Sequence, residues 1–297
     1  MRKRKFKQKL FIGVCGLSAV ITASLLIFIL GFIFMRAIPS LSWDYILTAE
    51  VDAGGFNEGI ANAIVGTIIL ATTSVVVATP LALAVAVYMT EYSKENWFTK
   101  TLRFMIDLLA GMPSIVLGVI GFVLLVISLK YITGGFSLIA GAIALAILVL
   151  PTIERAAEES LKTVPRELKE GSMALGSTKW QCIQKIVVPY SLSGIITGVV
   201  LGIGRAAEES AVVVLTAGYT QFMPRLGLFP KEGVFMNTKL APLQEGIASL
   251  PIAVYHSFEF SHMVPIENGF ATATVLIAVV MMINLTAKTI AWKYRIG

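Results

Sequence analysis

The residues best able to do chemistry in this sequence are three charged side chains within an apolar stretch. Arg205, Glu208 and Glu209 fall near the middle of residues 190–217. If that stretch crosses a bilayer, each charge costs about 3 kcal/mol or more, so these side chains must face other protein or a wet pathway. Spacings of three and four residues bring both carboxylates within reach of the guanidinium on one helix. We therefore expect them to line a substrate pathway; a structural ion cluster that braces the helices is the alternative.

A hexapeptide repeat points to a second arginine. Arg-Ala-Ala-Glu-Glu-Ser occurs at residues 155–160 and again at 205–210, although six residues can also match by chance. A guanidinium binds tetrahedral oxyanions through two parallel hydrogen bonds, so Arg155 and Arg205 on neighbouring helices would suit an anion that moves inward. The adjacent glutamates favour an oxyanion that keeps a proton to donate to a carboxylate. Phosphate keeps one at neutral pH and sulfate does not, which makes phosphate the preferred hypothesis.

The elements that must hold these side chains are membrane-spanning helices. Of the 297 residues, 56% are hydrophobic and 14% are charged, whereas soluble domains carry about 25% charged residues. This composition excludes soluble enzymes, nucleic-acid binders and secreted disulfide scaffolds. The predicted fold is an all-α membrane protein with six transmembrane helices in a single domain, residues 1–297. The six apolar stretches are long enough to cross a bilayer and lie at residues 10–35, 60–90, 104–129, 136–153, 190–217 and 269–291.

The distribution of basic residues sets the predicted orientation. Six of the first nine residues are Lys or Arg, and they precede an apolar run of 26 residues, which is too long for the core of a secretory signal. Eighteen of the 24 basic residues fall at the two termini, in residues 91–103 or in residues 154–186. Because Lys and Arg concentrate in cytoplasmic segments, both termini are expected in the cytoplasm. We expect a multi-pass membrane protein.

The longest inner segment, residues 157–186, is predicted to contain a short amphipathic helix. Pro165 suits the first helical position and Gly176 suits the residue after the helix end. Leu168 and Leu175 share one face at helical spacing. A helix this short is not stable alone, so we expect it to rest on a partner protein or at the membrane interface.

Small residues recur at every fourth position along the fifth apolar stretch, at Gly194, Gly198 and Gly202. Such a stripe lets a neighbouring helix pack closely. The sequence offers no nucleophile–base pair, and His256 and His262 are spaced more sparsely than the ligands of zinc motifs. The chain is therefore not expected to be an enzyme or to bind a metal or a cofactor itself.

The inner segment also carries a motif that resembles the EAA coupling loop of permease subunits of ABC importers. The run Glu170-Gly171-Ser172-Met173-Ala174-Leu175-Gly176 is followed ten residues later by Ile186-Val187-Val188-Pro189. In that family the loop forms a short helix seated in a cleft of a cytoplasmic ATPase. The resemblance assigns ATPase coupling to Pro165, Leu168, Glu170, Gly171, Ala174, Leu175, Gly176 and Pro189. No Gly-Lys dipeptide occurs in the sequence, so the chain lacks a P-loop, and the ATPase with its ATP and Mg²⁺ must be another subunit.

Nearly the whole chain resembles the A-type (PstA) permease subunits of phosphate-specific (Pst) ABC importers. The matching pieces include Pro80, Glu91-Tyr92, Gly111-Met112-Pro113-Ser114, Leu150-Pro151 and Ser249-Leu250-Pro251. The resemblance implies the type I importer architecture, ATP-driven import of inorganic phosphate, and a role in phosphate passage for Arg155 and Arg205. The chain departs from the family at Glu208, where a glycine is usual.

The resemblance also implies a location in a prokaryotic cytoplasmic (inner) membrane, and it implies the partners. These are a second permease subunit of the PstC type, two cytoplasmic ATPase subunits and an extracytoplasmic phosphate-binding protein, with no nucleic acid. Two other functions stay open from the residues alone. One is an ABC permease for another oxyanion or small solute, and the other is a proton-driven secondary carrier that uses Glu208 and Glu209 as proton sites.

Overall fold

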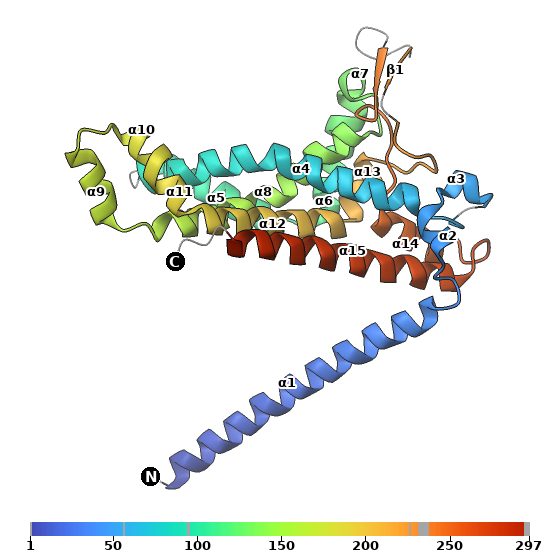
Figure 1. Cartoon of the computed structure of the whole chain (residues 1–297), viewed down its shortest axis with the longest axis horizontal. Coiled ribbons are helices and arrows are strands. Elements are labelled where there is room, and N and C mark those ends of the chain that lie inside the picture. Colours follow the sequence, from blue (N-terminus) through green and yellow to red (C-terminus); the bar gives the residue numbers. More distant parts are fainter. Residues whose placement is uncertain (1, 56, 94–95, 226, 231–237, 294–297) are drawn as a thin grey trace.

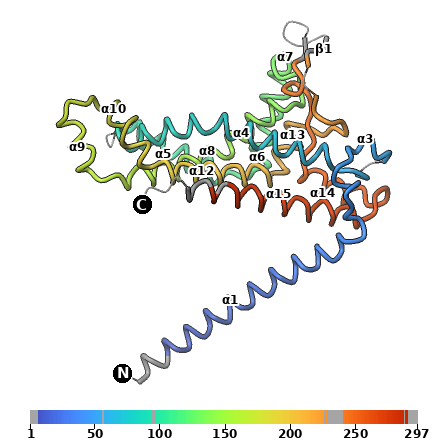
Figure 2. Tube along the Cα trace, viewed as in Figure 1, coloured from blue at the N-terminus to red at the C-terminus, as the bar shows by residue number. Residues whose placement is uncertain are grey.

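The protein is a bundle of long helices with a small region of short elements at one end (Figure 1). The computed structural model describes residues 2–55, 57–93, 96–225, 227–230 and 238–293. Figure 2 shows α1 leaving the bundle at an angle and both chain ends pointing toward the end that carries α9. Lys94 and Arg295, two of the basic residues on which the predicted orientation is based, lie outside the described residues. The long helices are α1 (Arg2–Ala37), α4 (Ala61–Val87), α5 (Trp97–Gly111), α8 (Leu138–Lys162), α12 (Leu192–Glu208) and α15 (Ile266–Lys293).

The first helix stands apart from the rest of the chain (Figure 1). Its apolar side chains are exposed on every side, and it meets the bundle near its C-terminal end. There Phe32 packs edge-on against Phe270 of α15 with ring centroids 5.8 Å apart, and Arg36 lies 4.0 Å from Glu267. An apolar helix with so little cover from its own chain must be covered by lipid or by another protein.

Helices α4, α8 and α12 form the centre of the bundle. Their core consists of small and aliphatic side chains, and Ala78, Leu145, Val149 and Ile153 are completely buried in it. Small residues let helix backbones approach closely, which supplies the packing that holds helices together where lipid removes the hydrophobic driving force.

The glycine stripe of the fifth apolar stretch lies against α8. A Cβ added at Gly198 would lie 2.7 Å from the Cβ of Ala156, and one at Gly202 would lie 2.9 Å from Cδ1 of Ile153. A Cβ at Gly194 would collide with Ser160. None of the three positions has room for a side chain, so these glycines set the close approach of α12 to α8.

The third apolar stretch, residues 104–129, is not one helix. α5 ends at Gly111, and after a bend of 103° the chain continues as α6 (Ser114–Gly121) and the π-helical turn η2 (Phe122–Ser128). Pro113 lacks a backbone N–H and disfavours helical geometry in the residue before it; Met112 is indeed extended, with ψ 132°. The single span predicted for residues 104–129 is therefore broken completely at this proline.

The fifth apolar stretch, residues 190–217, is also interrupted. α12 ends at Glu208, Glu209 is extended with φ −77° and ψ 124°, and a short helix follows. Within the described residues, four helices are long and apolar enough to cross a membrane. The number rises to six if two bent pairs each count as one span, namely Trp97–Gly111 with Ser114–Ser128 and, bent by 67° just before α12, Lys179–Tyr190 with Leu192–Glu208. The elements on either side of α12 are α10 (Lys179–Cys182), η3 (Ile183–Val187), α11 (Val188–Tyr190) and α13 (Ala211–Thr216).

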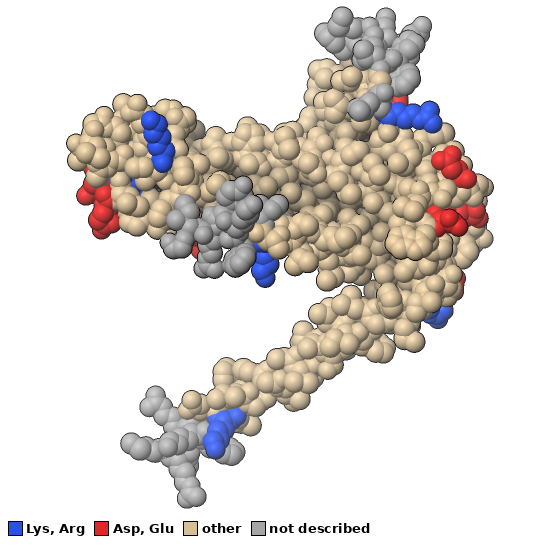
Figure 3. All heavy atoms as spheres, in the orientation of Figure 1, with Lys and Arg blue, Asp and Glu red and all other residues tan. Residues whose placement is uncertain are grey.

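The short helices α2, α3 and α14 lie at the end of the molecule opposite α9, and α7 lies beside a projecting hairpin (Figure 1). Charged side chains concentrate toward the two ends of the face seen in Figure 3, and its middle is almost free of them, as expected for a surface that meets lipid. The short elements are α2 (Trp43–Leu47), α3 (Glu50–Ala53), α7 (Lys130–Thr133), α14 (Leu250–Glu259) and the antiparallel pair β1 (Gly227–Pro230) and β2 (Thr238–Ala241).

A buried polar network joins these outer elements. The carboxylate of Glu50 is almost completely buried and accepts hydrogen bonds from the Tyr219 hydroxyl (2.6 Å) and the Asn57 backbone N–H (3.0 Å). The ring of His256 on α14 packs edge-on against Tyr219, with centroids 4.8 Å apart. Burial lowers the pKa of His256, and the nearby carboxylates of Glu259 and Glu50 act in the opposite direction.

Filling the contact between α12 and α8 should destabilise the bundle. Gly198→Leu forces a side chain into space that Ala156 already fills, and overpacking of this kind costs about 1–3 kcal/mol. We expect a lower thermal-unfolding midpoint for the detergent-solubilised variant. Gly13→Leu, on the exposed helix α1 with open space around the glycine, is the matched control, and equal midpoints for the two variants would contradict the packing role.

The stability of the outer elements should fall as the pH drops below 6.5. Because folding holds the pKa of His256 below its ordinary value of 6.5, the unfolded chain takes up a proton first, and the free energy of unfolding decreases. Above pH 6.5 the contribution of neutral His256 to the free energy of unfolding is fully present. Thermal unfolding followed between pH 7.5 and about 5 should depend less on pH in His256→Asn than in the unchanged protein or in His262→Asn. The same dependence in all three would show that His256 is not the responsible group.

Candidate functional site

The three charged residues of the fifth stretch lie where α12 ends. Arg205 and Glu208 are exposed on its last turn, and Glu209 lies beyond it. Within the described residues, no ion pair joins Arg205 to either carboxylate. The Glu209 carboxylate instead accepts hydrogen bonds from the backbone N–H groups of Ala211 (3.1 Å) and Val212 (3.4 Å). The prediction that both glutamates reach the guanidinium on one helix is wrong, because Glu209 leaves the helix to cap the start of α13.

Arg205 therefore presents its guanidinium on an open face of α12. The helix contacts α8 through Gly202, and a Cβ added at Gly204 would lie 2.9 Å from Asn284 Oδ1 of α15. These contacts cover two faces of α12 and leave Arg205 on the remaining one, where it is exposed. A guanidinium on such a face is costly against lipid, so this side of α12 must face water or another protein.

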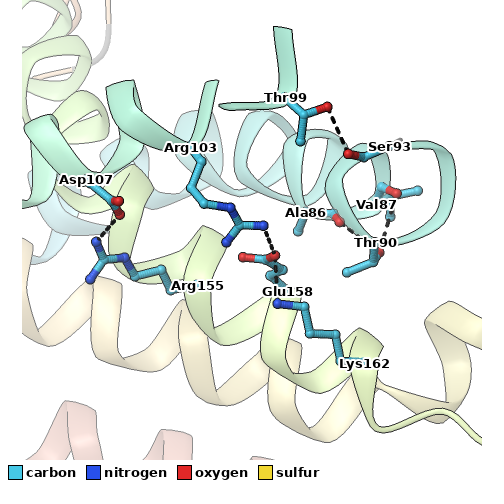
Figure 4. A network of polar contacts seen from close by, with 10 residues as sticks. All are labelled: Ala86, Val87, Thr90, Ser93, Thr99, Arg103, Asp107, Arg155, Glu158 and Lys162. Carbon is cyan, nitrogen blue, oxygen red and sulfur yellow. Dashed lines mark hydrogen bonds and ion pairs between the residues drawn. The ribbon is translucent and has the colours of Figure 1, made fainter. Parts of the chain in front are cut away.

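Arg155 has a partner on another helix. Its guanidinium lies 2.6 Å from Oδ1 of Asp107 on α5, and both side chains are more than half exposed (Figure 4). One turn further along α8, the Glu158 carboxylate pairs with Arg103 at 3.0 Å and with Lys162 at 2.8 Å. Together these ion pairs fasten α5 to the last turns of α8.

The structure does not bring the two arginines of the hexapeptide repeat together. α8 and α12 run antiparallel, and Gly198 packs at the level of Ala156. Arg205 follows Gly198 by seven residues, which places it about 10 Å beyond that level along the helix axis. Arg155 and Arg205 thus lie at different depths, and they could act on an anion only one after the other.

One buried carboxylate was not anticipated from the sequence. Glu154 on α8 is 1% exposed, and its Oε1 has no hydrogen-bond partner among the described residues. Glu158, one turn further along α8, pairs with Arg103 and with Lys162. No sequence signal separates Glu154 from the exposed Glu159, because burial on this helix depends on which other helices cover it.

The predicted inner-loop helix is present as α9 (Arg166–Ala174). Pro165 lies just before its first residue, one position earlier than expected. Gly176 has φ +90°, which favours glycine, and ends the helix through a hydrogen bond from its N–H to the Met173 carbonyl. The side chain of Leu175 is 91% exposed and that of Leu168 is 43% exposed.

The other residues expected to take part in ATPase coupling are also on the surface. Glu170, Gly171 and Ala174 are exposed on α9, and Pro189 is exposed on α11. No residue of α9 is completely buried, and the helix projects from the end of the bundle (Figure 1). Exposed apolar side chains on a projecting helix are typical of a surface that a partner covers.

α9 is tied to the end of α4. Lys169 lies 2.5 Å from the carboxylate of Glu91 in the π-helical turn η1 (Tyr88–Tyr92), and both side chains are largely buried. Lys179 donates to the backbone carbonyl of Glu91 and lies over the ring of Tyr92, 4.6 Å from its centroid. A displacement of α9 is therefore transmitted directly to α4, a central helix of the bundle.

Known proteins resemble this chain over most of its length. The family described as "Binding-protein-dependent transport system inner membrane component" matches residues 78–291. The phosphate transport system permease protein PstA of Pasteurella multocida (strain Pm70) is 30% identical over 285 residues, which cover 96% of this chain and 94% of that protein. The corresponding protein PstA 1 of Mycobacterium tuberculosis (strain ATCC 25618 / H37Rv) is 35% identical over 235 residues, or 79% of this chain and 70% of that protein.

The fold also has a solved counterpart. A chain of the bacterial alginate ABC transporter, in a crystal structure with an alginate pentasaccharide-bound periplasmic protein, aligns with a TM-score of 0.62 over 97% of both chains at 12% identity. This likeness concerns the fold, and it confirms the predicted all-α permease architecture. The family match includes the α9 loop and the break after α12. The chain is a multi-pass membrane protein that belongs to the family of binding-protein-dependent transport system inner membrane components.

Proposed function

We propose that this chain is the permease subunit of an ATP-driven importer of inorganic phosphate and that it forms half of the translocation pathway. The observation that carries the proposal is its identity of 30–35% with phosphate permeases from several bacteria over most of its length. The exposed guanidinium of Arg205 supports an anionic substrate, because a charge on an open face of a membrane helix needs a wet pathway or a counter-ion.

The position of the acidic residues supports phosphate among the oxyanions. Glu208 is exposed one turn beyond Arg205, and no ion pair within the described chain neutralises it. A fully ionised anion such as sulfate would be repelled there. Phosphate retains a proton at neutral pH and can donate it in a hydrogen bond to the carboxylate while Arg205 binds its other oxygens.

The chain would work within a larger assembly in a prokaryotic inner membrane. Its partners would be a second permease subunit of the PstC type, two cytoplasmic ATPase subunits that bind ATP and Mg²⁺, and an extracytoplasmic phosphate-binding protein. The exposed side chains of α9 would dock on an ATPase subunit. Closure of the ATPase pair would move α9, and the Lys169–Glu91 contact would pass that movement to α4.

Arg205→Lys should lower phosphate uptake by about tenfold or more, because a lysine cannot form the two parallel bonds of a guanidinium and hydrogen bonds to charged groups contribute about 1.5–3 kcal/mol. The measurement is uptake of radiolabelled phosphate by proteoliposomes that contain the whole complex. Arg225→Lys, in the loop after α13, is the matched control. Full uptake by Arg205→Lys in an intact complex would assign Arg205 a structural role.

Lys169→Met should uncouple ATP hydrolysis from transport, because it removes the cation that links α9 to Glu91. We expect stimulation of ATP hydrolysis by the binding protein to fall several-fold, since a partly buried carboxylate left unpaired destabilises the contact. Basal hydrolysis should be retained, and Lys169→Arg should restore stimulation. Lys185→Met, an exposed lysine of η3, is the control; equal stimulation in the two Met variants would argue against a coupling role for the contact.

A further inference from the structure

The break between α12 and α13 leaves backbone out of helical geometry inside the bundle. α12 contains 17 residues, so the break lies about 26 Å from its beginning. In a membrane protein, non-helical backbone at such a depth occurs where it is buried in protein or lines a water-filled cavity. Interrupted helices also form the substrate sites of many transporters.

A cavity of about 440 Å³ lies beside this break. Its walls come from the beginning of α6, from Ser210 and the first turn of α13, and from α14. Apolar side chains make up most of the wall, and the polar groups come from four residues, which are Ser210, Tyr255, His256 and Glu259. A mainly apolar cavity with a few convergent polar groups is the usual form of a small-molecule site.

Three of these polar groups have no hydrogen-bond partner within the described residues. Ser210 precedes α13 but its hydroxyl does not cap the helix, because the Glu209 carboxylate already accepts from the first N–H groups. The hydroxyl of Tyr255 and the carboxylate of Glu259 also make no hydrogen bond or ion pair with described residues. All three side chains are exposed in the single chain, so each is open to water or to a ligand that enters the cavity.

The three groups together match a protonated oxyanion. The Ser210 and Tyr255 hydroxyls can donate to unprotonated oxygens, and the Glu259 carboxylate can accept from an oxygen that keeps its proton. Arg205 lies three residues, about 4.5 Å along the helix axis, before the end of α12, and it is exposed. The order from the outer end inward is therefore cavity, Arg205 and then Arg155.

We infer that the cavity at the α12–α13 break is a phosphate-binding subsite, with Ser210 and Tyr255 as donors and Glu259 as the acceptor that selects a protonated oxyanion. The inference rests on the proposed function, because it assigns the substrate of that function to a place in this chain. Phosphate delivered from outside would pause here before it reaches Arg205. The subsite would reject sulfate because sulfate brings no proton to Glu259.

The first test uses the complete transporter in proteoliposomes with its binding protein. Ser210→Ala and Tyr255→Phe each remove one donor to an anion and should lower phosphate uptake by about five- to tenfold. ATP hydrolysis stimulated by the binding protein should stay within about twofold of the unchanged complex, which a merely misfolded variant would not achieve. Tyr190→Phe, an exposed tyrosine of α11, is the matched control.

The outcomes of this test separate the two proposals. If the unchanged complex imports phosphate and both variants do so at the same rate, the subsite is refuted and the proposed function stands. If the unchanged complex does not import phosphate, the proposed function fails and the subsite falls with it. Loss of uptake in the two variants but not in Tyr190→Phe supports the subsite.

A second measurement does not depend on transport. Ser210→Cys introduces a thiol into the cavity, in a Cys15→Ala background because Cys15 is exposed and Cys182 is buried. Inorganic phosphate at millimolar concentration should slow the reaction of this thiol with a charged thiosulfonate reagent at least threefold, and sulfate should not. Adding Glu259→Gln should remove the preference for phosphate over sulfate. Absence of protection, or equal protection by both anions before Glu259 is changed, would overturn the inference.

Discussion

The structure depends on one constraint. Polar groups and non-helical backbone have a high free-energy cost inside a lipid-embedded helical bundle. Lipid offers no hydrogen bonds, so an uncovered guanidinium, carboxylate or non-helical peptide needs protein or water beside it. Most of the bundle meets this constraint with continuous helices and small buried side chains such as Ala78 and Gly198. The last turn of α12 does not, because Arg205 and Glu208 remain exposed there.

A continuous series of contacts links the last turn of α12 to α9. α12 packs closely on α8, α8 is fastened to α5 by Arg155–Asp107 and Arg103–Glu158 (Figure 4), and α4 carries the contact with α9. The core is close-packed, so a displaced helix moves its neighbours rather than deforming alone. A partner that moves α9 can therefore change the surroundings of Arg205 without touching it. The exposed apolar surface of α1 and α9 is consistent with a chain that works only in an assembly.

Much of the fold could be predicted from the sequence because the strongest signals are local. The apolar stretches, the ends of the inner-loop helix near Pro165 and Gly176, and the glycine stripe of α12 each follow from residue type and spacing. The role of Glu209 could not be predicted from residue spacing. The same spacing suits an ion pair within one helix and a carboxylate that caps the following helix, and the two differ only in the backbone conformation at Glu209. The pairing of Arg155 with Asp107 and the burial of Glu50 depend on segments distant in sequence.

The central claim is that Arg205 and the break after α12 line a wet pathway for a protonated oxyanion. The most direct measurement is an electron cryomicroscopy structure of the assembled transporter, trapped with phosphate during turnover. The account predicts a continuous solvent-filled space along the exposed face of α12, with anion density between Ser210 and the Arg205 guanidinium. A map in which Arg205 is sealed in a dry contact between helices, with phosphate density elsewhere, would contradict it.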